Sequence, residues 1–137
     1  SHANTFGGNP IALAAMMAVI DVIKEEGLLE RAARLGAEVL KYFNDLKEEL
    51  EIIGDVRGKG LMIGVELVRD RRTKEPASKE LANVIEKSFK RGVVVIGAGM
   101  STIRIAPPLV IDEGLLFKAI DIIADVLREE NRNLRGP

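Results

Sequence analysis

The stretch IIGDVRGKGLMIGVELV, residues 52–68, holds two β-rich segments that are separated by two glycines and a lysine. Valine and isoleucine favour strands, and Gly58-Lys59-Gly60 gives the backbone the freedom that a tight connection needs. The stretch therefore predicts two adjacent strands, residues 52–57 and 61–68. It lies at the centre of the expected fold because helical patterns precede and follow it.

Two helices are predicted before this strand pair. Asn9 and Pro10 favour a helix start, because the Asn side chain accepts an early backbone N–H and proline at the first position wastes no donor. Gly27 suits the end of that helix. Its apolar face is rich in alanine, so we expect it to pack closely against a large neighbouring body. A second apolar stripe predicts a helix from Leu29 to Leu50.

Helix and strand patterns alternate after the strand pair. The charged run 69–76 is expected to be a solvated loop, and residues 130–137 are expected to fray. The order of elements predicts an α/β fold of the α+β two-layer kind, in which helices cover mainly one face of a small mixed sheet. The elements predicted in this half are a helix capped by Ser78 and ending at Gly92, strands 93–96 and 102–106, and a helix capped by Asp112 that runs through Leu127.

Composition restricts the possible functions. A chain of 137 residues with 47% hydrophobic content can bury one core. Twenty Lys and Arg against 21 Asp and Glu leave a net charge of −1, which disfavours nucleic acid and anionic membrane surfaces as partners. With no Cys and one His, a metal site is not expected. The sequence has no pattern of a membrane span or a signal peptide, so a cytoplasmic location is expected.

The stretch VVVIGAGM, residues 93–100, resembles the start of a dinucleotide-binding fingerprint. The full pattern needs Gly or Ala at position 102, which is Thr here, and it needs a helix afterwards. The following TIRIAPP instead predicts a strand that ends at prolines. We interpret these glycines as turn residues.

Arg104 is a candidate ligand-binding residue. Side chains alternate along a strand, so Ile103 and Ile105 face one side while Arg104 faces the other, away from the core. A guanidinium held on a rigid strand can bind a carboxylate through two parallel hydrogen bonds. The alternative is an arginine that is merely solvated or salt-bridged.

The loop before the first helix is a second candidate. Asn4, Thr5, Gly7 and Gly8 offer a hydroxyl, an amide and accessible backbone N–H groups just ahead of a helix start, which suits a phosphate group. The alternative is an ordinary capping loop.

Three stretches together resemble motifs of the class III aminotransferases, which are pyridoxal 5′-phosphate enzymes of fold type I. They are HANTFGGNP at 2–10, VRGKGLM at 56–62 leading into GVELV, and IRIAPPL at 103–109. They occur in the family's order at family-like separations, and the resemblance covers essentially the whole chain. The resemblance implies the carboxyl-terminal small domain of such an enzyme, with a mainly antiparallel sheet. Residues 1–27 would then be a remnant of the large cofactor-binding domain plus a crossover helix, and residues 28–137 would be the small domain.

The resemblance also implies roles for single residues. Thr5 matches the threonine that binds the cofactor phosphate of the other subunit in a homodimer, and Asn4 occupies the adjoining position, where a backbone contact is implied. Arg104 matches the arginine that receives a substrate carboxylate. Arg57 matches a motif position as well, and we interpret it as part of a structural ion pair.

The implied reaction moves an amino group between an amino acid or ω-amino acid and a 2-oxo acid. The resemblance leaves the amino donor open among 4-aminobutyrate, ornithine, acetylornithine, other ω-amines and α-amino acids. The family's Schiff-base lysine would lie upstream of residue 1, so no catalytic residue is assigned and the isolated chain is expected to be inactive. The alternatives are an amino-acid racemase or aminomutase of the same family, and a free-standing α+β binding module.

Overall fold

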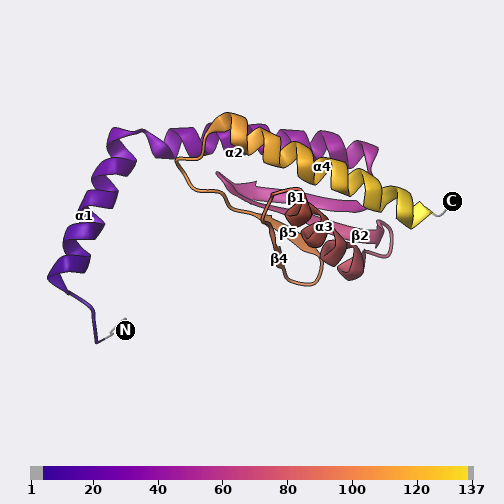
Figure 1. Cartoon of the computed structure of the whole chain (residues 1–137), viewed down its shortest axis with the longest axis horizontal. Helices are drawn as coiled ribbons and strands as arrows, with labels where there is room; N and C mark the ends of the chain where they lie inside the picture. The colour runs from indigo at the N-terminus through magenta and orange to yellow at the C-terminus, as the bar shows by residue number, and fades with distance from the viewer. Residues whose placement is uncertain (1–4, 136–137) are drawn as a thin grey trace.

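The computed structural model describes residues 5–135, which form four helices and five strands (Figure 1). The predicted α+β two-layer fold is confirmed. In chain order the elements are α1 (Pro10–Glu25), α2 (Leu28–Glu49), β1 (Ile53–Lys59), β2 (Met62–Asp70), β3 (Glu75–Pro76), α3 (Ser78–Lys90), β4 (Ile96–Ala98), β5 (Thr102–Ile105) and α4 (Glu113–Arg135).

The sheet is antiparallel throughout, with the strand order β1-β2-β5-β4. β2 and β5 therefore lie at its centre, and the short β3 pairs with the end of β2. Alternate residues of β2 and β5 face the helices and are buried: Ile63, Val65, Leu67, Ile103 and Ile105. The other residues of these strands face away from the helices, as the period of two requires.

Helices α2, α3 and α4 contribute their apolar stripes to one core with the sheet. Figure 1 shows α2 and α4 lying side by side over the sheet. A hydrogen bond between Tyr42 Oη of α2 and Asp121 Oδ1 of α4, 2.8 Å long, joins these two helices. Phe43 and Leu35 of α2 and Leu127 of α4 are fully buried between helices and sheet. One face of the sheet is thus covered, and the opposite face is open.

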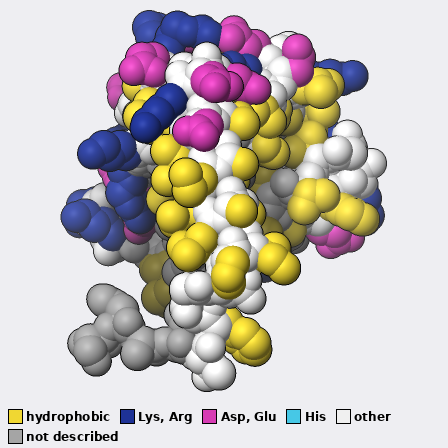
Figure 2. All heavy atoms as spheres, turned by 90° about the vertical axis from the view of Figure 1, so that its left-hand side faces the viewer, with side chains coloured by type: hydrophobic (Ala, Val, Ile, Leu, Met, Phe, Trp, Pro, Cys, Tyr) yellow, Lys and Arg dark blue, Asp and Glu magenta, His cyan; other side chains and the backbone are white. Residues whose placement is uncertain are grey.

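Helix α1 extends away from this two-layer body (Figure 1). Its predicted start is confirmed, since Asn9 Oδ1 accepts the N–H of Ile11 at 2.9 Å. Gly27 adopts the left-handed φ of 59° between α1 and α2, as predicted. None of the residues of α1 is buried, and its apolar side chains are exposed, with Ile11 at 82% and Met17 at 63%. Figure 2 shows hydrophobic side chains gathered along this helix.

Several predicted boundaries differ from the structure. The strand predicted at 93–96 lies at Ile96–Ala98, because only these residues reach the register of β5. Ala77, not Ser78, is the N-cap residue of α3, and its side chain forms no capping hydrogen bond. The cap predicted at Asp112 is confirmed, since its Oδ1 accepts the N–H of Leu115 at 2.9 Å.

Three apolar residues of the predicted helices are exposed: Leu29 (68%), Phe89 (67%) and Leu115 (61%). Each directly follows or precedes a buried residue of the true stripe, as Leu29 follows Leu28. One step along a helix rotates a side chain by about 100°, which takes it off the buried face.

The carboxyl-terminal residues 130–135 are helical, although the sequence predicted fraying there. Buried polar side chains explain the difference. Glu130 is 1% exposed and accepts hydrogen bonds from Lys87 Nζ at 2.7 Å and Asn83 Nδ2 at 2.8 Å. Asn131 Oδ1 accepts the backbone N–H of Ile52 at 3.0 Å. These bonds fix the last turns of α4 to α3 and to the start of β1.

The charged run 69–76 is not simply a solvated loop. It contains β3, and two of its arginines are bound by other elements. Arg71 donates to the carbonyls of Lys47, Leu50 (2.9 Å) and Ile53 (3.2 Å), so a guanidinium satisfies carbonyls at the end of α2. Arg69 pairs with the largely buried Glu80 of α3 at 3.2 Å.

Candidate functional site

Arg104 lies on the open face of the sheet. Ile103 and Ile105 beside it are buried at 0% and 6% exposure while Arg104 is exposed, which confirms the predicted alternation. In register, Gly64 of β2 and Ile96 of β4 flank it. Its guanidinium forms no hydrogen bond or ion pair with any other residue that the structure describes. The salt-bridged alternative for Arg104 therefore has no support within residues 5–135.

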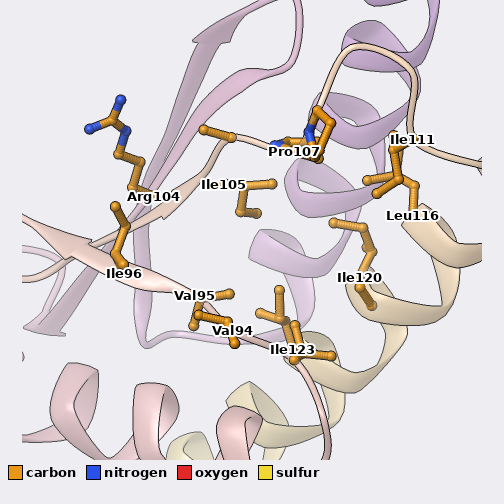
Figure 3. Close-up of a pocket in the computed structure, with 14 residues that line it drawn as sticks. Val94, Val95, Ile96, Arg104, Ile105, Pro107, Ile111, Leu116, Ile120 and Ile123 are labelled. Carbon is orange, nitrogen blue, oxygen red and sulfur yellow. The ribbon is translucent and has the colours of Figure 1, made fainter.

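An apolar cavity of about 360 Å³ lies behind this arginine, between the β4–β5 edge and α4. Figure 3 shows Ile105, Ile120 and Ile123 around the cavity, while the Arg104 guanidinium points away from it. The charged group is thus presented on the sheet face, and its strand is fixed from below by apolar packing.

The loop that follows β5 is attached to α2. Arg31 donates from Nη1 to the carbonyl of Leu109 at 2.6 Å and from Nη2 to the carbonyl of Ile111. Arg34 of the same helix pairs with Glu113 at the start of α4. These contacts hold the Pro107-Pro108 segment in place next to the strand that carries Arg104.

Arg57 shares the open sheet face with Arg104. Its Nη1 lies 2.8 Å from Asp55 Oδ2 and 2.6 Å from Glu66 Oε2. The hydrogen bond that Arg57 donates to Asp55, and then the one that it donates to Glu66, raise the pKa of Arg57 above its ordinary value. The predicted ion pair of Arg57 is present.

The other predicted site residues lie at the far end of α1. Asn4 lies outside the described residues. Thr5 is exposed in a turn over residues 5–8, where Gly8 has a φ of 79°. The first amides of α1 are already bound by Asn9, so the donors left for a ligand are the Thr5 hydroxyl and the turn amides. A hydroxyl and exposed N–H groups before a helix suit a phosphate.

Helix α1 separates Thr5 from the sheet that carries Arg104 (Figure 1). Sixteen residues of α-helix span about 24 Å, so the two residues do not share a site within one chain. A site that contains both would need another polypeptide.

The glycines of residues 93–100 turn the chain, as interpreted from the sequence. β4 and β5 form a hairpin, and Gly99 in the turn has a φ of 57°. A strand follows these glycines, so the helix N-terminus of a dinucleotide site is missing here.

Sequence reasoning missed the residues that surround the two arginines. Gly64 lies between Arg57 and Arg104 in register, and Glu66 lies two residues further along β2. A period of two along 61–68 puts Gly64 and Glu66 on one face, but which strands flank them depends on pairing. Arg31 and Arg71 bind backbone carbonyls, for which no local sequence signal exists.

Comparisons with known proteins agree on one family. The class III aminotransferase family model matches residues 1–127. The leucine/methionine racemase of Thermococcus litoralis is 47% identical over 135 residues, which are 96% of this chain and 30% of that protein. Human mitochondrial alanine–glyoxylate aminotransferase 2 is 42% identical over 131 residues, which are 93% of this chain and 26% of that protein.

Solved structures agree with the family model. A PLP-bound amine transaminase from an uncultivated Pseudomonas species superposes with a TM-score of 0.79 at 33% identity. The superposition covers 95% of this chain and 29% of that one. The chain therefore belongs to the class III aminotransferases, and it spans less than a third of the length of these relatives.

Family membership implies pyridoxal phosphate as the cofactor. The residues present fit one part of it, because the Thr5 turn offers neutral donors for a phosphate group. Among residues 5–135 no three His, Cys, Asp or Glu side chains are grouped to hold a metal ion. No helix in the described part of the chain has the length and apolar character to span a membrane.

Proposed function

We propose that this chain is the carboxyl-terminal part of a pyridoxal-phosphate-dependent class III aminotransferase. The whole enzyme would move an amino group between an amino acid or ω-amino acid and a 2-oxo acid. The observation that carries the proposal is Arg104, an exposed guanidinium without a described partner on a central strand. A chain that covers 26% and 30% of its relatives is consistent with a part of a longer enzyme.

In this proposal the chain's residues bind and orient. Arg104 holds the substrate carboxylate through its planar fork, which fixes how the amino acid lies. Thr5, with its sequence neighbour Asn4, would bind the cofactor phosphate of the partner subunit in a homodimer. Pyridoxal phosphate, when bound, would supply an electron sink for the substrate that these residues hold.

The domain division is part of the same proposal. Residues 28–137 would form the small domain, and residues 1–27 would belong to the large cofactor-binding domain and the crossover helix. Support comes from α1, which has no buried residue, whereas the stripes of α2, α3 and α4 share one core. An exposed apolar helix of this kind needs a covering body in the whole protein.

Replacement of Arg104 in the full-length enzyme tests the proposal. Arg104→Met removes two charged hydrogen bonds, so KM for a carboxylate-bearing amino donor should rise about ten- to hundredfold. Arg104→Lys should give a smaller rise, because one ammonium cannot reproduce the fork. A primary amine without a carboxylate is the control and should keep its KM. Equal KM values for both donors in Arg104→Met would refute the role.

The isolated 137-residue chain is proposed to be inactive, because the family's cofactor-binding lysine would lie in the missing part. Incubation with pyridoxal phosphate, reduction with borohydride and peptide mass spectrometry would test this. We expect no single lysine to be labelled in preference to the other lysines. Stoichiometric labelling of one lysine would contradict the assignment and would favour a free-standing module with its own cofactor site.

A second candidate function is amino-acid racemisation, which the 47% identity to a racemase favours. The two reactions differ in the fate of nitrogen. A full-length enzyme given ¹⁵N-labelled L-leucine and an unlabelled 2-oxo acid in D₂O should transfer ¹⁵N to the acid if it is an aminotransferase. A racemase would instead leave ¹⁵N on leucine and produce the D-isomer with deuterium at Cα.

A further inference from the structure

The open sheet face carries a small set of charged side chains in known register. Arg57 of β1 and Arg104 of β5 both pair with Gly64 of β2, from opposite sides. Glu66, two residues along β2 on the same face, pairs with Asp55 on one side and Thr102 on the other. The carboxylate of Glu66 is therefore a diagonal neighbour of both arginines.

Diagonal neighbours in antiparallel strands lie within reach of long side chains. Between the two arginines Gly64 has no side chain, and a Cβ there would meet only the Thr102 methyl, at 3.1 Å, and the Arg57 carbonyl, at 3.9 Å. Nothing on β2 at this position screens Glu66 from either guanidinium. Glu66 can thus pair with Arg57 or with Arg104.

The structure shows which of the two arginines binds Glu66. Arg57 binds Asp55 at 2.8 Å and Glu66 at 2.6 Å, although one carboxylate would be enough to neutralise it. Two neutral pairs, Arg57 with Asp55 and Arg104 with Glu66, would be the simpler distribution of charge. The observed distribution instead leaves Arg104 as a cation beside a cluster with one excess negative charge.

We propose that Arg57 is a positioning residue that holds the Glu66 carboxylate away from Arg104, so that Arg104 stays open to a carboxylate-bearing substrate. The inference rests on the proposed role of Arg104 and extends it to Arg57 and Glu66. Without Arg57, Glu66 becomes an internal competitor that occupies the guanidinium the substrate needs. Arg57 contacts no substrate in this scheme and acts only through Glu66.

The size of the effect follows from the strength of an exposed pair. The paired form of an exposed ion pair is about two to five times as populated as the open form. Self-pairing of Glu66 with Arg104 would then raise the apparent KM of a carboxylate-bearing donor about three- to sixfold, with little change in kcat. Arg57→Met is suitable as the perturbation, because the Arg57 side chain is 55% exposed and the core is untouched.

The kinetic test uses four forms of the full-length enzyme: wild type, Arg57→Met, Glu66→Gln and Arg57→Met/Glu66→Gln. We expect a raised KM in Arg57→Met alone, a value close to wild type in Glu66→Gln, and recovery in the double variant. An amine donor without a carboxylate should keep its KM in all four. A normal KM in Arg57→Met, or no recovery in the double variant, overturns the proposal.

Capture of Glu66 by another cation is one of the outcomes. Lys74 lines the same pocket as Asp55 and Glu66. If it took over Glu66 in Arg57→Met, KM would stay normal and the proposal would fail. Failure of the underlying function looks different, because Arg104→Met would then leave KM unchanged as well.

A second measurement uses the 137-residue chain and needs no activity. The side-chain Nε–Hε resonance of Arg104, assigned by its loss in Arg104→Lys, reports a bound carboxylate. It should shift in Arg57→Met, return in the double variant and stay in place in Glu66→Gln. A shift in Glu66→Gln would show that Glu66 already contacts Arg104, which overturns the proposal even if Arg57→Met does not fold.

Discussion

Helix α2 approaches the turn between β1 and β2 so closely that only glycine fits at position 36. A Cβ built on Gly36 would lie 2.1 Å from the carbonyl oxygen of Gly60 and 2.4 Å from its carbonyl carbon. Non-bonded contacts of a Cβ atom below 3.0 Å essentially never occur, so the helix and the turn would have to separate. Both partners are backbone, and neither can move aside as a flexible side chain would.

Two opposing effects decide the outcome of Gly36→Ala. Alanine in a helix interior stabilises the folded state by about 1 kcal/mol relative to glycine. Separating the two backbones by about 1 Å disturbs the packing under them, at a cost of about 2–3 kcal/mol. We therefore expect the free energy of unfolding to fall by about 1–2 kcal/mol. The sign of this change separates the two effects, because the higher helix propensity of alanine alone would raise the free energy of unfolding.

Urea denaturation followed by circular dichroism at 222 nm measures the change. For a domain of this size the midpoint should fall by about 0.5–1 M. Ala33→Gly is the matched control, since Ala33 is exposed on the same helix and reports the helix term without a clash. A midpoint that rises in Gly36→Ala would refute the reasoning, because it would mean that the contact with Gly60 relaxes at no cost.

Three further predictions concern the two-layer body of helices and sheet. Burial and the hydrogen bond to Asp121 raise the pKa of Tyr42 to about 12. The chain has one tyrosine, so its titration can be followed by absorbance at 295 nm, and the midpoint should lie at about pH 10 in urea and at about pH 12 in the folded chain. The neutral hydroxyl therefore contributes to the free energy of unfolding below pH 10, and this contribution is lost as the pH rises through 12. A titration midpoint at pH 10 in the folded chain would contradict this prediction. Arg71→Met should lower the free energy of unfolding by about 1–3 kcal/mol, since it leaves carbonyls of α2 unsatisfied. The control is Arg72→Met at an exposed position, which should change the free energy of unfolding by less than about 0.5 kcal/mol. Equal effects of the two substitutions in urea melts would refute the capping role of Arg71. Phe43→Ala removes a fully buried ring and should lower the free energy of unfolding by about 3–5 kcal/mol in the same urea melts. A loss of less than about 1 kcal/mol would contradict this prediction.

Local features of the structure were predictable from the sequence. The start of α1 depends on Asn9 and Pro10, and the exposure of Arg104 depends on alternation within a few residues. Both are short-range effects, in which a side chain bonds to a nearby amide or a backbone has a fixed period. The family motifs added the implied carboxylate-binding role of Arg104 without any knowledge of its neighbours.

The boundaries that were wrong have a long-range cause. β4 begins at Ile96 because pairing with β5 selects it, and α4 continues past Glu130 because Lys87 and Asn83, more than 40 positions earlier, bind that carboxylate. The run 69–76 was interpreted as a loop because its contacts with the end of α2 are also distant in sequence.

The sequence by itself determined the helices, the alternation of the strands and the family, since each is encoded in residues close together along the chain. Only the tertiary structure decided that Glu66 is a diagonal neighbour of two arginines and is bound by one of them. Strand register makes that decision, because it is set by pairing between segments almost 40 residues apart and by the core beneath them.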